Sequence, residues 1–220
     1  MIRDVYLREL NYLDDTEIRY HIKKRFVEHL IAFYLAGKIE RLSDLDILWD
    51  SDKFKLIGDA FDSICLFFER NINAEDLEIK KINEIKQLCE KVLNRYKPSG
   101  DYDEFYTALS GFIVSLPIED PKWQLAQTKK LFAHNFREFY IKDIFEQMKN
   151  WVNNFPDEVL DTLEERVSNT DSWQFQHKRE VIYQIFENLI KIEDERVNIR
   201  TVVLINLIGA KGFYEFKNLL

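Results

Sequence analysis

Apolar residues recur every three or four positions along most of the 220-residue chain, and polar residues occupy the positions between them. This spacing places apolar side chains on one face of an α-helix. Only ten residues are glycine or proline, and nearly all of them fall between the periodic stretches. The sequence therefore predicts an all-α protein, an irregular bundle of about eight to ten mostly antiparallel helices with no sheet.

The periodic stretches define the expected helices. They cover residues 16–36, 53–70, 77–96, 101–116, 121–155, 156–167, 173–195 and 197–208, with a last helical turn within 212–220. The stretch 121–155 predicts one long helix with a bend, about 50 Å from end to end. The residues expected to face inward on the first helix are Ile18, Ile22, Phe26, Leu30 and Phe33. On the second helix Leu66 is expected among the inward residues.

The length of the chain allows one compact domain, because folding at this size hides roughly 70% of the surface of the unfolded chain. We therefore expect a single helical domain over residues 1–220. The segment Lys97-Pro98-Ser99-Gly100 combines turn residues with a change in charge balance. It is the candidate for a subdomain boundary near residues 97–101.

Charge and cysteine content narrow the class of partner. The net charge is -8, and most of the acidic excess lies in the second half of the chain. This balance disfavours nucleic acid and favours a basic protein as partner. Cys65 and Cys89 stand in apolar helical stretches, so we expect buried, reduced thiols and a cytoplasmic protein. No apolar stretch approaches the roughly 20 residues that span a bilayer, so no membrane partner is expected.

Four polar residues, Glu17, His21, Arg25 and His29, stand at intervals of four on the first long helix. One interpretation is a salt-bridged surface face. The alternative is a site: Glu17 and His21 as metal ligands, or His21, Arg25 and His29 as catalytic residues. His29 lies about 12 Å along the axis from His21, too far to share one ion.

The segment Arg25-Phe-Val-Glu-His29 resembles the Arg and His motif of the HEPN ribonucleases, an all-helical family. The resemblance covers two residues, and the three residues between them are fewer than that family has. It implies the alternative function, a helical enzyme or RNA-binding module such as a ribonuclease. Distant parts of the chain would then supply the partners of the three residues.

Other signatures of chemistry are absent from the sequence. The chain has no phosphate-binding glycine loop, no nucleophile elbow and no paired Glu and His of a di-iron bundle. No cofactor is therefore expected. This leaves a non-enzymatic protein as the leading hypothesis.

An acidic helix is the strongest candidate for a partner-binding surface. Its carboxylates are Asp157, Glu158, Asp161, Glu164 and Glu165. Four tryptophans near expected helix ends, at 49, 123, 151 and 173, would add aromatic contacts. The leading hypothesis is an interaction module, such as an immunity protein, antitoxin or adaptor, that binds a basic protein through this acidic and aromatic surface.

Overall fold

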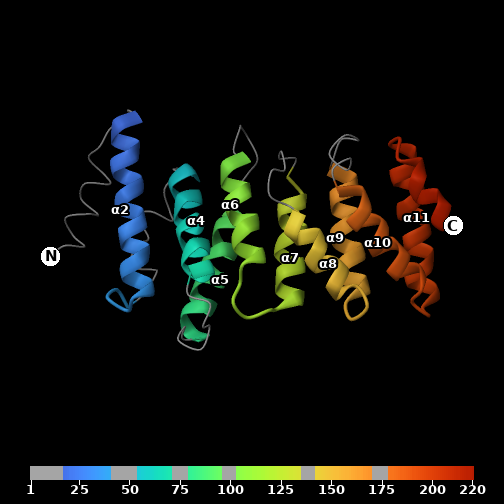
Figure 1. Ribbon diagram of the computed structural model, residues 1–220, viewed down its shortest axis with the longest axis horizontal. Coiled ribbons are helices and arrows are strands. Elements are labelled where there is room, and N and C mark those ends of the chain that lie inside the picture. The colour runs from blue at the N-terminus through green and yellow to red at the C-terminus, as the bar shows by residue number, and fades with distance from the viewer. Residues whose placement is uncertain (1–16, 41–53, 71–78, 96–102, 135–141, 170–177) are drawn as a thin grey trace. The chain divides into compact units, whose positions relative to one another are not determined.

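The computed structural model describes residues 17–40, 54–70, 79–95, 103–134, 142–169 and 178–220 (Figure 1). These residues form helices and no strand, which confirms the all-α class. The helices are α2 (Glu17–Leu35), α4 (Phe54–Arg70), α5 (Ile79–Arg95), α6 (Asp103–Val114), α7 (Pro121–Phe132), α8 (Lys142–Trp151), α9 (Pro156–Asn169), α10 (Arg179–Ile190), α11 (Glu195–Ala210) and the 3-10 helix η4 (Tyr214–Leu219).

The chain divides into two compact units, Met1–Ile118 and Glu119–Leu220, which we call unit 1 and unit 2. The boundary expected near residues 97–101 lies outside the described residues. The division between the two units comes after Ile118, because α6 packs against α4 and so belongs to the first unit. Asp120 begins α7 on the other side of the division and accepts a hydrogen bond from the Trp123 backbone N–H at 3.3 Å.

Unit 1 is built around α4, which lies between α2 and α6 (Figure 1). Aromatic rings join α4 to α6: the Phe61 and Phe112 ring centroids are 5.1 Å apart, and those of Phe54 and Phe105 are 5.5 Å apart. Cys65 on α4 is buried, as is Cys89 on α5, which confirms the expectation for both thiols. Leu66 was expected inside, but it is 48% exposed because the core side of α4 passes through Cys65 and Phe68.

The buried face of α2 differs from the predicted one. Ile22 and Phe33 were expected inside, and both are exposed. Leu30 is buried as expected, and the other buried residues include Val27, Ile31 and Tyr34. Each lies one position from a residue of the predicted stripe, which rotates the buried face by about 100°. The prediction failed because α2 is apolar on more than one side, so the spacing alone did not select the face.

The helices of unit 2 form two layers. In one layer α9 packs between α7 and α11, and in the other α8 packs against α10 (Figure 1). Contacts of α8 with α7 and α9, and of α10 with α11, join the layers. One residue of α9 enters this core as a charged group: Arg166 is buried, with its guanidinium carbon 5.0 Å from the Phe132 ring centroid. Burial lowers the pKa of Arg166 to about 9.

The single long helix predicted over 121–155 is wrong, because α7 ends at Phe132 and α8 begins at Lys142. The two segments fold back on each other, since the Phe132 and Phe145 rings stack with centroids 5.8 Å apart. In one continuous helix these residues would be about 20 Å apart along the axis. The apolar periodicity continues through the break because both helices face the same core.

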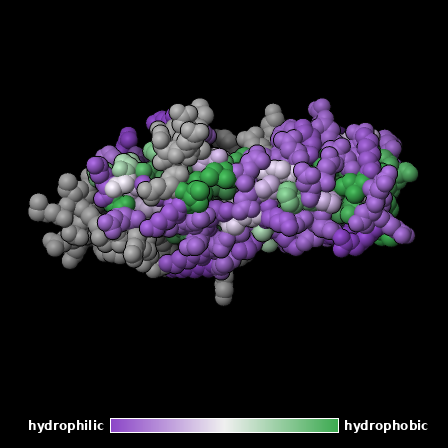
Figure 2. Space-filling model, turned by 90° about the horizontal axis from the view of Figure 1, so that it is seen from below, coloured by the Kyte–Doolittle hydropathy of each residue, from purple (hydrophilic) through white to green (hydrophobic). Residues whose placement is uncertain are grey.

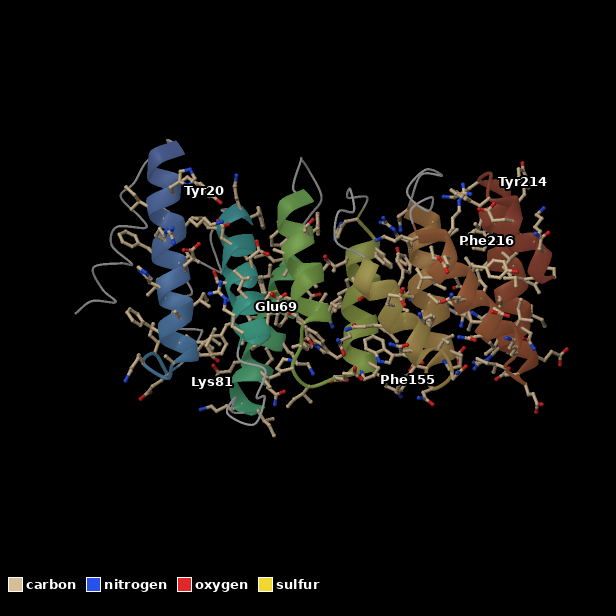
Figure 3. The ribbon with its side chains drawn as sticks, viewed as in Figure 1. Tyr20, Glu69, Lys81, Phe155, Tyr214 and Phe216 are labelled. Carbon is tan, nitrogen blue, oxygen red and sulfur yellow. The ribbon has the colours of Figure 1, made fainter. Side chains whose placement is uncertain are left out.

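The last helix is η4, and its two aromatic residues differ in burial (Figure 3). Phe216 is fully buried, and its ring centroid lies 5.6 Å from that of Phe186 on α10. Tyr214 is exposed. Within the described part of the chain, no helix has both the length and the apolar content that crossing a bilayer requires.

Candidate functional site

The histidine stripe of α2 points to solvent. His21, Arg25 and His29 are all exposed, and Arg25 forms an ion pair with Glu28 at 3.2 Å. The three side chains therefore lie on an open helix face and not in a cavity shared with a second helix. The position of the Glu17 side chain, the second ligand of the expected metal pair, lies outside the described residues. Among the residues that are described, no group of three or more His, Cys, Asp or Glu side chains could hold a metal ion.

Next to this stripe, α2 and α4 share a second polar cluster, which is partly buried. Asp59 of α4 is buried and accepts a hydrogen bond from the Tyr20 hydroxyl and one from Lys24 Nζ at 2.6 Å. The bond to Asp59 is the main reason why the pKa of Lys24 is raised. The Lys55 ammonium lies 4.7 Å from the Tyr20 ring centroid. These contacts join α2 to α4, so the cluster stabilises unit 1.

The acidic helix, α9, meets a cation that the sequence did not reveal. Arg200 of α11 bonds to Asp157 at 3.1 Å, to Asp161 at 2.6 Å and to Glu164 at 3.1 and 3.0 Å. Arg196, one turn earlier on α11, pairs with Asp157 as well. Two arginines four positions apart were the only signal in the sequence for this contact.

The remaining acids of α9 also have partners within unit 2. Lys129 lies 3.2 Å from Asp161, and Lys122 lies 3.7 Å from Glu158. Glu165 accepts a hydrogen bond of 2.8 Å from the Asn169 side chain. The five carboxylates were expected to be solvated and open to a basic partner. In the structure all five are partly exposed and also make contacts within the chain.

These contacts alter the ionisation of the site. Burial alone would raise the pKa of Asp161, but hydrogen bonds from Arg200 and Lys129 outweigh burial and lower it. The hydrogen bonds that Arg200 donates to Glu164 and Asp161 raise its pKa despite its partial burial. The acids of α9 therefore join α9 to α7 and α11, and less of their charge is left for a partner. Of the tryptophans, Trp151 is buried, and Trp49 and Trp173 lie outside the described residues.

Next to these arginines, the outer side of α11 is apolar and exposed. The exposed fractions are 58% for Ile199, 39% for Val202, 54% for Val203 and 50% for Leu207. Their spacing of three and four places them on one helix face, which Asn206 and Ala210 complete. We call these six residues the α11 apolar face. In Figure 2, hydrophobic side chains gather over the α11 end of unit 2, with hydrophilic ones beside them.

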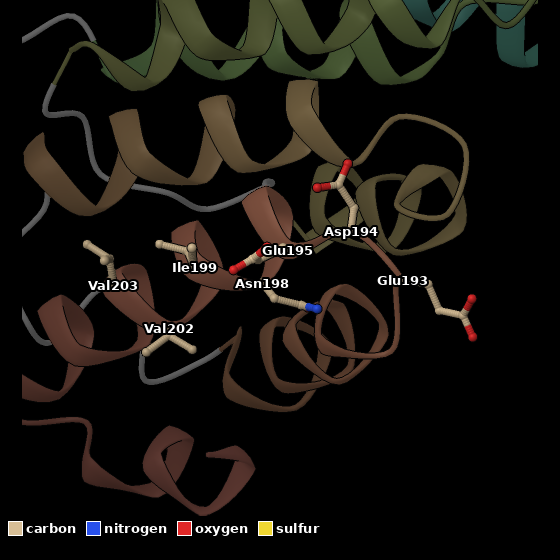
Figure 4. A pocket seen from close by; sticks show the side chains of 7 residues that line it. All are labelled: Glu193, Asp194, Glu195, Asn198, Ile199, Val202 and Val203. Carbon is tan, nitrogen blue, oxygen red and sulfur yellow. The ribbon is translucent and has the colours of Figure 1, made fainter.

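A shallow groove of about 480 Å³ runs along the first half of this face (Figure 4). Ile199, Val202 and Val203 form its apolar part. At its end lie the carboxylates of Glu193 and Glu195. Neither of these glutamates forms an ion pair with any residue that the structure describes. The groove therefore combines an apolar floor with a negatively charged end.

The other end of α11 is basic. Lys217 of η4 folds back over Gly209, and its Cε and Nζ atoms lie 2.6 and 3.6 Å from the point that a Cβ at Gly209 would occupy. The Lys217 ammonium also lies 5.8 Å from the Tyr214 ring centroid. A larger residue at position 209 would displace Lys217, so the glycine lets this ammonium lie beside the last turn of α11. Negative and positive charge thus flank the apolar face at opposite ends.

No family model matches the chain, and no significant similarity to a curated protein or to a solved structure was found. The sequence-derived expectations placed the site on α2 or on α9. The exposed apolar face of α11 was missed, because apolar spacing does not distinguish a buried helix face from an exposed one.

Proposed function

We propose that the chain is a protein–protein interaction module and that the α11 apolar face is its docking surface. The observation that carries this proposal is the row of half-exposed aliphatic side chains from Ile199 to Leu207. Exposed contiguous apolar surface bordered by polar residues is typical of interaction sites.

α11 carries apolar side chains on its buried side and on its outer side. Val197, Leu204 and Ile208 are buried against unit 2, while Ile199 and Leu207 face solvent. The buried side already supplies what folding needs. Burial of a leucine or valine side chain contributes on the order of 1.5 to 3 kcal/mol, so covering the exposed side would drive association.

The charge at the groove keeps a basic partner in the proposal, as the sequence favoured. Glu193 and Glu195 can each pair with a cation of the docked protein. The five acids of α9 stay an alternative surface for such a partner, weakened by their contacts with Arg200 and its neighbours. Roles as an immunity protein, antitoxin or adaptor are all compatible with a docking module and remain predictions.

The test compares two leucines of nearly equal exposure, Leu207 at 50% and Leu66 at 48%. The tagged full chain, a Leu207→Asp variant and a Leu66→Asp variant are each used to capture proteins from cells of the source organism, with quantitative mass spectrometry. We expect at least one protein, an untagged copy of this chain included, to be retained by the parent and by Leu66→Asp and lost with Leu207→Asp. Identical captured sets for all three proteins would refute the proposal.

A further inference from the structure

The α11 apolar face carries opposite charges at its two ends, which restricts what can cover it. Glu195 lies at the first position of the helix, on the same face as Ile199 and Val202. The Lys217 ammonium lies beside Gly209, near the last turn. Glu195 and Gly209 are each seven residues from Val202, about 10 Å along the axis in either direction. The face is therefore complementary to itself when it is turned end for end about Val202.

We infer that the occupant of the α11 apolar face is a second copy of this chain, packed with the two α11 helices antiparallel. This inference rests on the proposed function, since it names the partner of the same docking surface. A second copy is acidic as a whole, with a net charge of -8, so it replaces the basic protein with a partner that brings one local cation, Lys217, to the groove. A two-fold axis through Val202 and Val203 places Glu195 of one copy next to Lys217 of the other, twice per dimer. Two-fold self-complementary contacts of this kind are the commonest in symmetric oligomers.

The order of residues along the face agrees with this arrangement. With the axis between Val202 and Val203, Ile199 of one copy lies level with Asn206 of the other, and both are near the middle of the α11 apolar face. Leu207 of each copy lies within about one residue rise of the level of Ile199 of the other. The aliphatic side chains near the axis pack together.

The size of the face sets the strength of the dimer. A helix of 16 residues is about 24 Å long and about 10 Å wide, so the two copies bury less than the roughly 1,200 Å² of a standard stable interface. A contact of this size is typical of weak, transient complexes. The dimer is populated at high protein concentration and exchanges with monomer on dilution.

The experiment is sedimentation velocity of the full chain from low to several hundred micromolar. We expect the weight-average mass of the parent to rise toward twice the monomer mass with concentration. Leu207→Asp, and the milder Leu207→Gln, should remain monomeric, whereas Leu66→Asp should associate like the parent. Far-ultraviolet circular dichroism of each variant identifies any that does not fold, and the milder variant then replaces it.

Charge reversal tests the antiparallel arrangement directly. Glu195→Lys and Lys217→Glu should each weaken association roughly tenfold, because each reversal places like charges together at two positions of the dimer. The double variant, Glu195→Lys with Lys217→Glu, restores opposite charges and should associate like the parent. High salt should reduce all of these differences.

Two results would overturn the inference: a parent chain that stays monomeric throughout, or a double variant that associates no better than the single ones. If the parent is monomeric but captures a different cellular protein that Leu207→Asp does not capture, the inference is overturned and the proposed function stands. If Leu207→Asp changes neither self-association nor the set of captured proteins, the inference and the proposed function are both overturned.

Discussion

Replacing Arg200 by methionine removes the cation that three carboxylates of α9 share. Arg200 is 26% exposed and makes four hydrogen bonds to Asp157, Asp161 and Glu164. A hydrogen bond to a charged group contributes about 1.5 to 3 kcal/mol when well buried, and this group is only partly buried. We therefore expect the free energy of unfolding of unit 2 to fall by about 2 to 3 kcal/mol in total. Methionine preserves most of the aliphatic packing of the stem.

Arg196→Met is the matched control, because Arg196 lies one turn away on the same helix. It is 67% exposed and pairs with a single carboxylate, that of Asp157. An exposed pair of this kind contributes at most about 1 kcal/mol. Both variants lose one positive charge, so a difference between them reports the contacts of Arg200 and not the change in net charge.

The loss of stability caused by Arg200→Met is expected to depend on pH in a definite direction. The pKa of Asp161 is lowered in the folded chain, so its interaction with Arg200 stabilises the fold above the ordinary carboxyl pKa of about 3.9. That contribution is lost as the pH falls through the lowered value, because the carboxylate is protonated. The effect of Arg200→Met should therefore be full at neutral pH and should decrease as the pH falls below the ordinary carboxyl pKa and through the lowered pKa of Asp161.

Urea unfolding followed by tryptophan fluorescence measures this effect, since three of the four tryptophans, at 123, 151 and 173, belong to unit 2. The expected result is a larger loss of stability for Arg200→Met than for Arg196→Met at neutral pH, and little difference at low pH. Equal losses for the two variants, or a loss for Arg200→Met that does not change with pH, would refute the reasoning.

Two further predictions concern unit 1. Asp59→Ala removes the acceptor of both Tyr20 and Lys24, and we expect it to lower the free energy of unfolding by about 2 kcal/mol. The control is Asp62→Ala at an exposed position, for which we expect a loss of less than about 0.5 kcal/mol. Urea unfolding followed by circular dichroism compares the two variants. Burial raises the pKa of Cys65 to about 12, so the unfolded chain ionises first and stability falls as the pH rises above about 9. Cys65→Ala should remove about 1.4 kcal/mol of this loss per pH unit, and parallel curves for parent and variant between pH 8 and 10 would contradict the assignment.

The sequence predicted the existence of the helices far better than their faces. Turn residues and periodicity placed most helix ends within a few residues of the observed ones, as for α4 and α5. The inward face of α2 was predicted wrongly, because Ile22 and Phe33 compete with Val27 and Ile31 for the core and packing against α4 decides between them. Periodicity records where apolar residues stand, and only tertiary contact decides which of them are covered.

The candidate site could not be derived from the sequence for a related reason. The acids of α9 and Arg200 are separated by 36 to 43 positions, so no local spacing links them. An acidic helix read in isolation predicts a charged surface, and the same helix beside α11 becomes one side of an ion-pair network. The Lys217 ammonium likewise reaches the end of α11 only because η4 folds back over Gly209.

The two sides of α11 support each other. Arg200 holds one flank of the helix to three carboxylates of α9, and Val197, Thr201 and Ile208 are buried beneath it. Rotation of the helix about its axis would break these contacts, so the neighbouring apolar face is fixed in its outward orientation. A docking surface that is rigid before binding loses little conformational entropy when a partner covers it. The carboxylates of α9, from which the sequence predicted a binding surface, therefore have a supporting role. They hold in place the apolar face that we propose as the interface.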